Sequence, residues 1–453
     1  MSTLQDRGLW REMAGIVLPM ALQNLFTSLV SASDALMLGG LSQTGLSAVS
    51  LATQVAFVHS LFVMAFMIGE STLAAQYWGK GDRETVERVL GLTLRYALAA
   101  SAVFSLAALC VPGWLMRCFT SDKELIDAGS RYLRVVSPAY LLGGFSQVYL
   151  CIMKNSGRVK RSSLYGTLTV VMNLLLNALL IYGLLGLPSL GIAGAALATV
   201  LSRLLEAVLV ALENHLPDRI HMHRAAVLHP EKGLVRAFWK ITRPVLANEL
   251  AWGGGVTMYS VIMGHLGNDA VAAHAVAGIV KNAVGCVASG FGNGVAILIG
   301  NRLGAGKLEQ AKREGGKLVR MSLVIGSVSG LAVLLLLPLI RHLSGNLSDA
   351  AQAYLGSMLV ICAFYMIGKS LNSTIIVGIF CAGGDTVFGF LSDLIAIWGV
   401  ILPLGSLAAF VFSLPVPWVF LILSLDEFIK IPFEYRHYMQ YRWVKNLTEG
   451  AQE

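Results

Sequence analysis

The chain has 453 residues, of which 56% are hydrophobic and 13% charged, and its mean hydropathy is +0.68. A soluble domain carries about 25% charged residues, so this composition excludes an ordinary soluble enzyme and a disordered regulator. The net charge of +8 comes without the basic, aromatic-interleaved patch of a nucleic-acid-binding protein. We therefore expect no nucleic-acid partner and place the basic residues in cytoplasmic loops of a membrane protein.

Twelve apolar segments, separated by polar or Gly- and Pro-containing breaks, are long enough to cross a membrane. They are residues 13–39, 51–78, 88–111, 125–153, 162–185, 192–214, 238–265, 270–302, 311–337, 350–380, 387–412 and 417–438. The first segment is too long for the apolar region of a cleavable signal, so we expect it to be a transmembrane helix. The pattern predicts an all-α polytopic membrane protein with twelve transmembrane helices.

The basic residues alternate between the predicted loops. Twenty-four lysines and arginines, with Lys430 counted among them, fall in segments on one side of the predicted membrane, and only Arg117, Lys123 and Arg341 fall in loops on the other. Basic residues concentrate on the cytoplasmic side of membrane proteins. The asymmetry predicts that both termini are cytoplasmic, as expected of a multi-pass protein of the inner cell membrane.

The chain repeats internally. A shift of 225 residues aligns Pro19 with Pro244, Gly79 with Gly304, and Arg88 with Arg313 without a gap. Each half contains an even number of predicted helices, so both halves enter the membrane in the same orientation, related by a pseudo-two-fold axis along the membrane normal. We therefore expect two six-helix lobes, with an N-lobe at 1–215, a cytoplasmic linker at 216–236, a C-lobe at 237–440 and a cytoplasmic tail at 441–453. Two such lobes around a central cavity are typical of a secondary transporter.

Charged residues inside the predicted helices need a partner or a function, because each costs about 2.5–3.5 kcal/mol near the bilayer centre. They are Asp34, Glu70, Arg203, Glu206, Glu249, Lys281, Lys369 and Asp393. Arg203 and Glu206 are three residues apart on one helix face and can pair with each other. For Glu70, Lys281 and Lys369, a contact with substrate and an ion pair between lobes are both open.

Asp34 has no basic residue three or four positions away, so it must either carry a proton or bind a cation. Asn173 and Asn177 share one helix face, and Ala195 and Thr199 share another, because each pair is four residues apart. Carboxylate, amide and hydroxyl oxygens are ligands that suit Na⁺, and the same carboxylate can instead carry a proton. The alternative is that the asparagines only hold helices together.

Several motifs resemble those of the multidrug and toxic compound extrusion (MATE) family. They are "DALMLGGL" at Asp34, the paired glycine motifs "QYWGKGD" and "NRLGAGK", "NLLLNALLIYG", "LGIAGAALAT" and "CAGGDT". The resemblance covers nearly the whole chain. It implies cation-coupled export of amphipathic, often cationic drugs, with Na⁺ or H⁺ as the coupling ion and no other cofactor. It also implies a cation site formed by Asp34, Asn173, Asn177 and Thr199, with Ala195 as a backbone ligand.

The C-lobe departs from one branch of that family, in which a helix 7 Glu and a helix 10 Asp bind Na⁺. Glu249 lies about one turn nearer the cytoplasm, and the Asp position falls near Lys369. This argues against a C-lobe cation site of that kind and makes Glu249 a cavity or gating carboxylate. Asp393 lies outside the family's mapped site, with Lys369 as a candidate partner. Trp252 and Tyr259 are aromatic residues that can line the cavity and stack on cationic drugs.

These features predict a secondary antiporter that exports small amphipathic or cationic molecules, works by alternating access, contacts membrane lipids and is a monomer. A lipid-linked saccharide or lipid flippase of the same superfold is the alternative, and it requires a basic central cavity. No catalytic constellation is evident, so we do not expect an enzyme. Apart from Na⁺ at Asp34 we expect no metal, since neither the six cysteines nor the histidines have ligand spacing.

Overall fold

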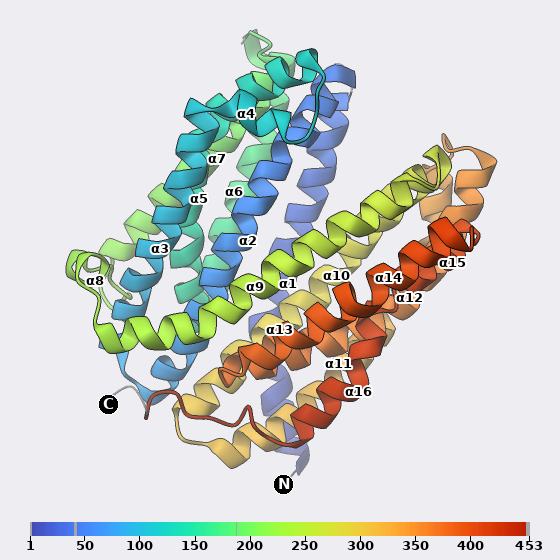
Figure 1. Cartoon of the computed structure of the whole chain (residues 1–453). Helices are drawn as coiled ribbons and strands as arrows, with labels where there is room; N and C mark the ends of the chain where they lie inside the picture. Colours follow the sequence, from blue (N-terminus) through green and yellow to red (C-terminus); the bar gives the residue numbers. More distant parts are fainter. Residues whose placement is uncertain (1, 40–42, 187, 450–453) are drawn as a thin grey trace. The chain divides into compact units, whose positions relative to one another are not determined.

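A computed structural model describes residues 2–39, 43–186 and 188–449 (Figure 1). The described residues form helices and no strand, which confirms the all-α prediction. The helices of the first half are α1 (Ser2–Gly39), α2 (Gln43–Lys80), α3 (Arg83–Cys110), α4 (Pro112–Arg117), α5 (Lys123–Asn155), α6 (Val159–Tyr182) and α7 (Gly191–His215), with a 3₁₀ turn η1 (Leu184–Gly186). The long helices of the second half are α9 (Lys232–Gly264), α10 (Asn268–Gly304), α11 (Leu308–Leu343) and α12 (Asp349–Asn372).

Ten helical segments among the described residues are long and apolar enough to cross a membrane. The two remaining predicted spans differ from these for physical reasons. Helix α9 is long enough, but Asn248, Glu249 and three consecutive glycines lower its hydropathy. The last predicted span is broken into α15 (Val416–Leu423) and α16 (Asp426–Met439).

The C-terminal spans contain wide turns that a periodicity argument does not predict. Helix α12 continues into the π-helical segment η2 (Ser373–Phe380). The next span consists of α13 (Thr386–Leu394), η3 (Ile395–Ile401), α14 (Leu402–Ser406) and η4 (Leu407–Val411). Pro403 lies at the start of α14, where its missing N–H removes a helical hydrogen bond. π-Helical turns inside helices are frequent at functional sites.

The predicted linker is partly helical. A short helix α8 (Arg224–Leu228) lies within it, and α9 begins at Lys232 rather than near residue 238. Helix α8 packs against α3.

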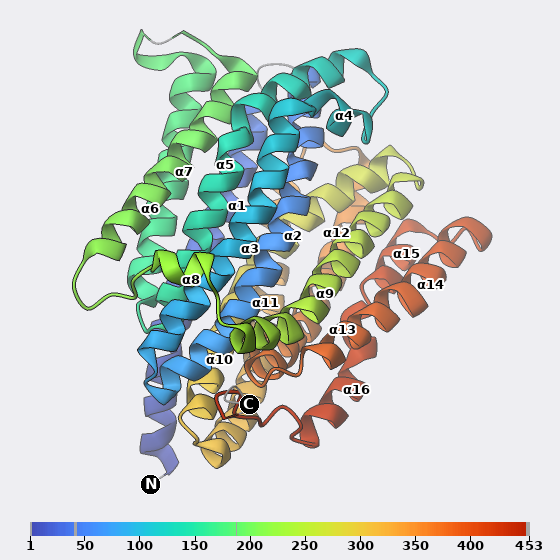
Figure 2. The same cartoon turned by 60° about the vertical axis from the view of Figure 1, so that its left-hand side comes forward.

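The chain forms two compact units. Unit 1 consists of residues 1–25, 75–81 and 240–453, and unit 2 consists of residues 26–74 and 82–239. In unit 2, helix α7 packs against α5 and α6, and the three lie side by side in Figures 1 and 2. In unit 1, α11 and α10 pack against α12. Each unit has a buried apolar core, which includes Leu133 and Ala196 in unit 2 and Leu359 and Phe420 in unit 1.

Candidate functional site

Polar side chains of α6 and α7 form a connected cluster in unit 2. The Asn177 amide donates to the Asn173 side-chain oxygen at 3.3 Å, and the Asn173 amide donates to the Ser202 hydroxyl at 3.4 Å. The Thr199 hydroxyl donates to the carbonyl oxygen of Ala195 at 3.1 Å. The structure therefore brings Asn173 and Asn177 together with the helix that carries Thr199 and Ala195.

Asp34 lies in α1, but its side chain is outside the described part of the structure. The contacts of Met37, three residues later in α1, show what lies next to this turn of the helix. The Tyr182 hydroxyl at the end of α6 donates to the Met37 carbonyl oxygen at 3.1 Å. Met37 also packs against the unit 2 core that contains Ile181 and Ala195. The turn that carries Asp34 thus runs beside the C-terminal end of α6.

Ser202 is a cluster member that the sequence analysis did not identify. It is three residues after Thr199, to whose carbonyl oxygen it donates at 2.9 Å, and it is buried in unit 2. Helical spacing from Ala195 and Thr199 was the signal available for it, because residues three and four apart share a face.

The polar face of α7 continues to Glu206. Its carboxylate accepts from the Ser146 hydroxyl of α5 at 2.6 Å and pairs with Arg203 at 2.8 Å. The pairing of Arg203 with Glu206 that their spacing predicted is therefore confirmed.

Glu70 is completely buried in α2, with the Cys151 thiol of α5 as a polar neighbour. It forms no ion pair within the described residues. The two interpretations that the sequence left open for it, a substrate contact and an interlobe pair, stay predictions.

The intramembrane charges of unit 1 do not pair as expected. Asp393 of α13 pairs with Lys430 at 2.7 Å, while Lys369 of α12 pairs with Glu427 at 3.3 Å. The suggested Asp393–Lys369 pair was wrong, because Lys430 lies nearer to Asp393. Lys430, which the topology argument counted among the basic residues of the cytoplasmic side, is buried. Glu249 of α9 has Asp393 and Lys369 as charged neighbours.

Aromatic rings lie beside Lys281 and Lys369. The Lys281 ammonium is 3.7 Å from the centre of the Tyr365 ring, and the Lys369 ammonium is 5.9 Å from that of Trp252. The Tyr259 hydroxyl is buried and has no hydrogen-bond partner among the described residues. Trp252 and Tyr259 both contact the apolar core of unit 1.

The two glycine motifs of the repeat meet in unit 1. A Cβ atom at Gly79 would lie 2.1 Å from the Asn301 carbonyl oxygen, and one at Gly304 would lie 1.8 Å from that of Gln76. The ends of α2 and α10 are thus in direct backbone contact, which no other residue type at these positions allows. This contact explains why glycine recurs at both motifs.

The segment after α16 covers this contact. The Gln76 amide donates to the carbonyl oxygens of Ala382 and Lys445, at 2.7 and 3.2 Å, and its oxygen accepts from the Leu447 N–H at 2.7 Å. Trp443 in the same segment is fully buried. The predicted tail is therefore packed in unit 1 through residue 449, and its last four residues lie outside the described part.

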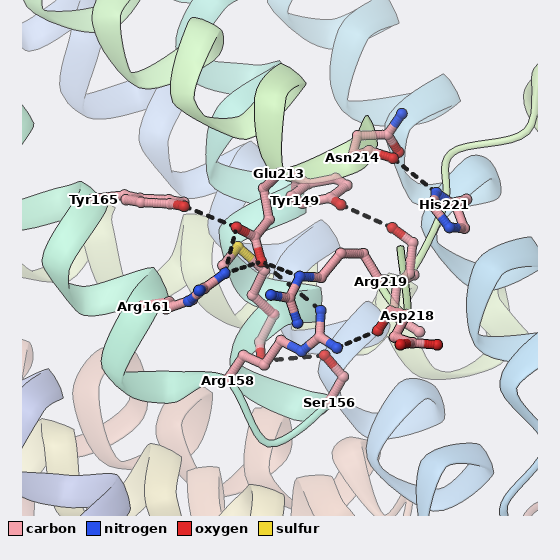
Figure 3. A network of polar contacts seen from close by, with 12 residues as sticks. Tyr149, Ser156, Arg158, Arg161, Tyr165, Glu213, Asn214, Asp218, Arg219 and His221 are labelled. Carbon is pink, nitrogen blue, oxygen red and sulfur yellow. Dashed lines mark hydrogen bonds and ion pairs between the residues drawn. The ribbon is translucent and has the colours of Figure 1, made fainter. Parts of the chain in front are cut away.

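A second polar network within unit 2 holds the linker against α5, α6 and α7 (Figure 3). The buried carboxylate of Glu213 pairs with Arg219 at 2.9 Å, Arg161 at 3.3 Å and Arg158 at 3.8 Å, and it accepts from the Tyr165 hydroxyl at 2.8 Å. Burial and the nearby Arg219 charge lower the pKa of Arg158, which nevertheless stays a cation because a guanidinium does not deprotonate in proteins.

The linker backbone takes part in the same network. The Arg158 guanidinium donates to the Asp218 carbonyl oxygen, and the Tyr149 hydroxyl donates to that of Ile220 at 2.8 Å. Nearby, His223 pairs with Glu87 at 2.9 Å. No group of three metal-ligating side chains occurs among the described residues, the linker histidines included.

Curated relatives match along most of the chain. It is 23% identical over 450 residues to a probable multidrug resistance protein YoeA of Bacillus subtilis, covering 96% of this chain and 94% of the relative. It is 27% identical over 412 residues to a probable multidrug resistance protein NorM of Burkholderia pseudomallei, covering 88% and 85%.

Solved structures share the fold. A MOP superfamily transporter from Pyrococcus furiosus superposes with a TM-score of 0.86 at 17% identity, with 96% of each chain covered. An outward-facing multidrug resistance MATE family transporter superposes with a TM-score of 0.84 at 17% identity, covering 95% of this chain and 96% of the other.

The family model described as MatE matches the chain twice, at residues 19–179 and 246–407, once in each half of the internal repeat. These two matches account for most of the chain. The chain therefore belongs to the MatE family, whose members are membrane transporters of the multidrug efflux type and not enzymes.

Proposed function

We propose that this protein is a secondary antiporter that exports amphipathic, often cationic molecules in exchange for Na⁺ or H⁺. The observation that carries the proposal is the connected polar cluster of α6 and α7 beside the α1 turn of Asp34. A carboxylate flanked by amide and hydroxyl oxygens either coordinates Na⁺ or takes up a proton. The MatE family assignment supports drug export over the flippase alternative.

In this proposal Asp34 carries the coupling ion, and Asn173, Asn177, Thr199 and the Ala195 carbonyl complete its surroundings. The Thr199 hydroxyl is directed to the Ala195 carbonyl, so an arriving cation would have to draw the hydroxyl oxygen into coordination. A proton requires no such rearrangement, because Asp34 alone is enough to carry it.

Export substrates would be held by aromatic and acidic groups. Trp252, Tyr259 and Glu249 of α9 supply ring faces and a carboxylate, both of which attract organic cations. Glu70 of α2 is a separate candidate carboxylate. Lys281 and Lys369 would compete with such a cation while their ammoniums lie over Tyr365 and Trp252, and departure of a lysine from its ring would expose the ring face to substrate.

Alternating access would open and close, on the cytoplasmic side, the backbone contact between the ends of α2 and α10, where Gly79 lies against Asn301 and Gly304 against Gln76. We place the protein as a monomer in the inner cell membrane, with both termini in the cytoplasm and the lobes divided at 1–215 and 237–440.

The proposal is tested by dye efflux from proteoliposomes, driven separately by a Na⁺ gradient and by a pH gradient. Asp34→Asn should insert and fold but lose efflux driven by either gradient. Asp127→Asn, a change to an exposed acid of α5, is the matched control and should transport as the unaltered protein does. Undiminished efflux by Asp34→Asn would exclude the coupling role. Binding of lipid head groups without dye transport would favour the flippase.

A further inference from the structure

A group of buried charges lies among α12, α13 and α16 of unit 1, apart from the cluster near Asp34. Its acidic members are Asp393, Asp426, Glu427 and Glu434, and its basic members are Lys369 and Lys430. All of them except Lys369 are less than one-tenth exposed. Buried charges require compensation by an opposite charge or by a proton.

Two of the four acids are compensated by lysines. The Lys430 ammonium lies between Asp393 at 2.7 Å and Glu427 at 3.1 Å, and Lys369 pairs with Glu427 at 3.3 Å. Glu427 also accepts from the Asn372 amide at 2.8 Å and from the Tyr365 hydroxyl at 3.1 Å. Two ammoniums and two carboxylates therefore balance each other and are well hydrogen-bonded.

Asp426 and Glu434 remain without an ion pair among the described residues. Asp426 is in the first turn of α16, where the helix dipole stabilises an anion, and Lys281, Lys369 and Lys430 are its charged neighbours. One carboxylate oxygen of Asp426, Oδ1, has no hydrogen-bond partner among the described residues, but the helix dipole and the three lysines favour its ionised form.

Glu434 has no such support. It is fully buried two turns further along α16. Its Oε1 accepts from the Ser392 hydroxyl at 3.1 Å, and its Oε2 has no hydrogen-bond partner. Lys430 is its basic neighbour on α16, but that ammonium is already held by Asp393 and Glu427.

We propose that Glu434 holds a proton, so that the buried cluster of α12, α13 and α16 is a proton-binding site separate from Asp34. The bound species is a proton and not a metal cation, because the Lys430 ammonium already occupies the position between the carboxylates that a cation would take. This inference goes beyond the proposed antiport and does not depend on it.

The charged groups around Glu434 favour its protonated form. Helices α12 and α13 and segments η2 and η3 pack against α16, and η2 and η3 contain no titratable residue. On α16 itself the titratable residues besides Glu434 are Asp426, Glu427, Lys430, Tyr435, Arg436, His437 and Tyr438. The titratable groups that the other helices contribute to the cluster and its neighbours are Tyr365 and Lys369 of α12, Asp393 of α13 and Asp385 at its N-cap, Lys281 of α10, and Glu249 and Tyr259 of α9. Since Asp393, Asp426 and Glu427 are already anions in this cluster, ionisation of Glu434 would add a fourth negative charge against the two ammoniums of Lys369 and Lys430.

Infrared spectroscopy of the purified full-length protein in lipid vesicles tests the proposal directly. A protonated carboxyl group has a carbonyl-stretch band that shifts in D₂O. We expect this band at neutral pH to lose one component in Glu434→Gln and to keep it in Glu309→Gln, a matched control at an exposed acid of α11. Identical bands in Glu434→Gln and the unaltered protein would overturn the proposal.

Two further measurements keep the test decisive if Glu434→Gln does not fold. Ser392→Ala removes the hydroxyl that donates to Glu434 and should shift the frequency of the same component, while an unmoved band would contradict the assignment. Addition of NaCl in place of KCl should leave the component unchanged. Its loss with NaCl would show that a metal cation displaces the proton and would overturn the proton assignment. None of these readouts requires transport, so a failure of the antiport proposal would leave them unaffected.

Discussion

Asn173 of α6 and Ser202 of α7 are joined by a hydrogen bond of 3.4 Å, and this bond connects the amide pair to the helix of Thr199. A polar bond between membrane helices can simply hold them together. It can also orient the Asn173 oxygen, which accepts from Asn177 at 3.3 Å, for a cation. The two roles predict different consequences when Ser202 is altered.

Ser202→Ala should weaken binding of the coupling ion more than it destabilises the fold. Loss of one hydrogen bond between membrane helices costs about 0.6 kcal/mol, which corresponds to a roughly threefold change in a binding constant. We expect the half-saturating concentration of the driving ion in proteoliposome efflux to rise by about that factor. Ser260→Ala in α9, whose hydroxyl bonds only to its own helix, is the control. A lower thermal midpoint with unchanged ion dependence would show that Ser202 only joins the helices.

Gly304→Ala should disrupt the contact between the ends of α2 and α10. The added Cβ would lie 1.8 Å from the Gln76 carbonyl oxygen. This backbone atom cannot move aside in the way that a flexible side chain can. Overpacking of this kind costs about 1–3 kcal/mol, so the thermal midpoint should fall by several degrees. Gly278→Ala in the same helix meets no atom within 4 Å and should be neutral or stabilising. Equal midpoints for the two variants would contradict the contact.

Trp443→Ala should release the C-terminal segment. Trp443 is fully buried and stacks on Tyr438 at a ring-centre distance of 5.8 Å. Removal of a buried tryptophan costs about 3–5 kcal/mol. We expect a large drop in thermal midpoint and rapid proteolysis of the segment after α16. Trp418→Ala removes a tryptophan that is 59% exposed and should cause neither effect. A protected segment in Trp443→Ala would argue against this packing.

The sequence predicts those parts of the fold and of the candidate site that depend on regular helical spacing. Asn173 with Asn177 and Arg203 with Glu206 were identified because residues three or four apart share a face. The acids and Lys430 of α16 have the same spacing, but a lysine near the end of the last predicted span has the same sequence signal as a basic residue of the cytoplasmic side, so spacing alone does not predict the buried charge cluster. The π-helical turns of η2 and the packing of Trp443 depend on tertiary contacts, which periodicity does not encode.

Glu213→Gln should loosen the linker from the helices α5, α6 and α7 that it packs against. The substitution keeps the shape of the side chain but leaves Arg158, Arg161 and Arg219 facing a neutral amide. Breaking a buried ion pair by removal of one partner costs about 3–5 kcal/mol. The half-exposed Arg161 contributes less than the other two because solvent screens it. We expect trypsin to cleave the linker after Arg219 faster in this variant than in the unaltered protein. Glu309→Gln, which removes a surface pair with Lys312, should leave the cleavage rate unchanged, and equal rates in all three proteins would show that Glu213 does not hold the linker.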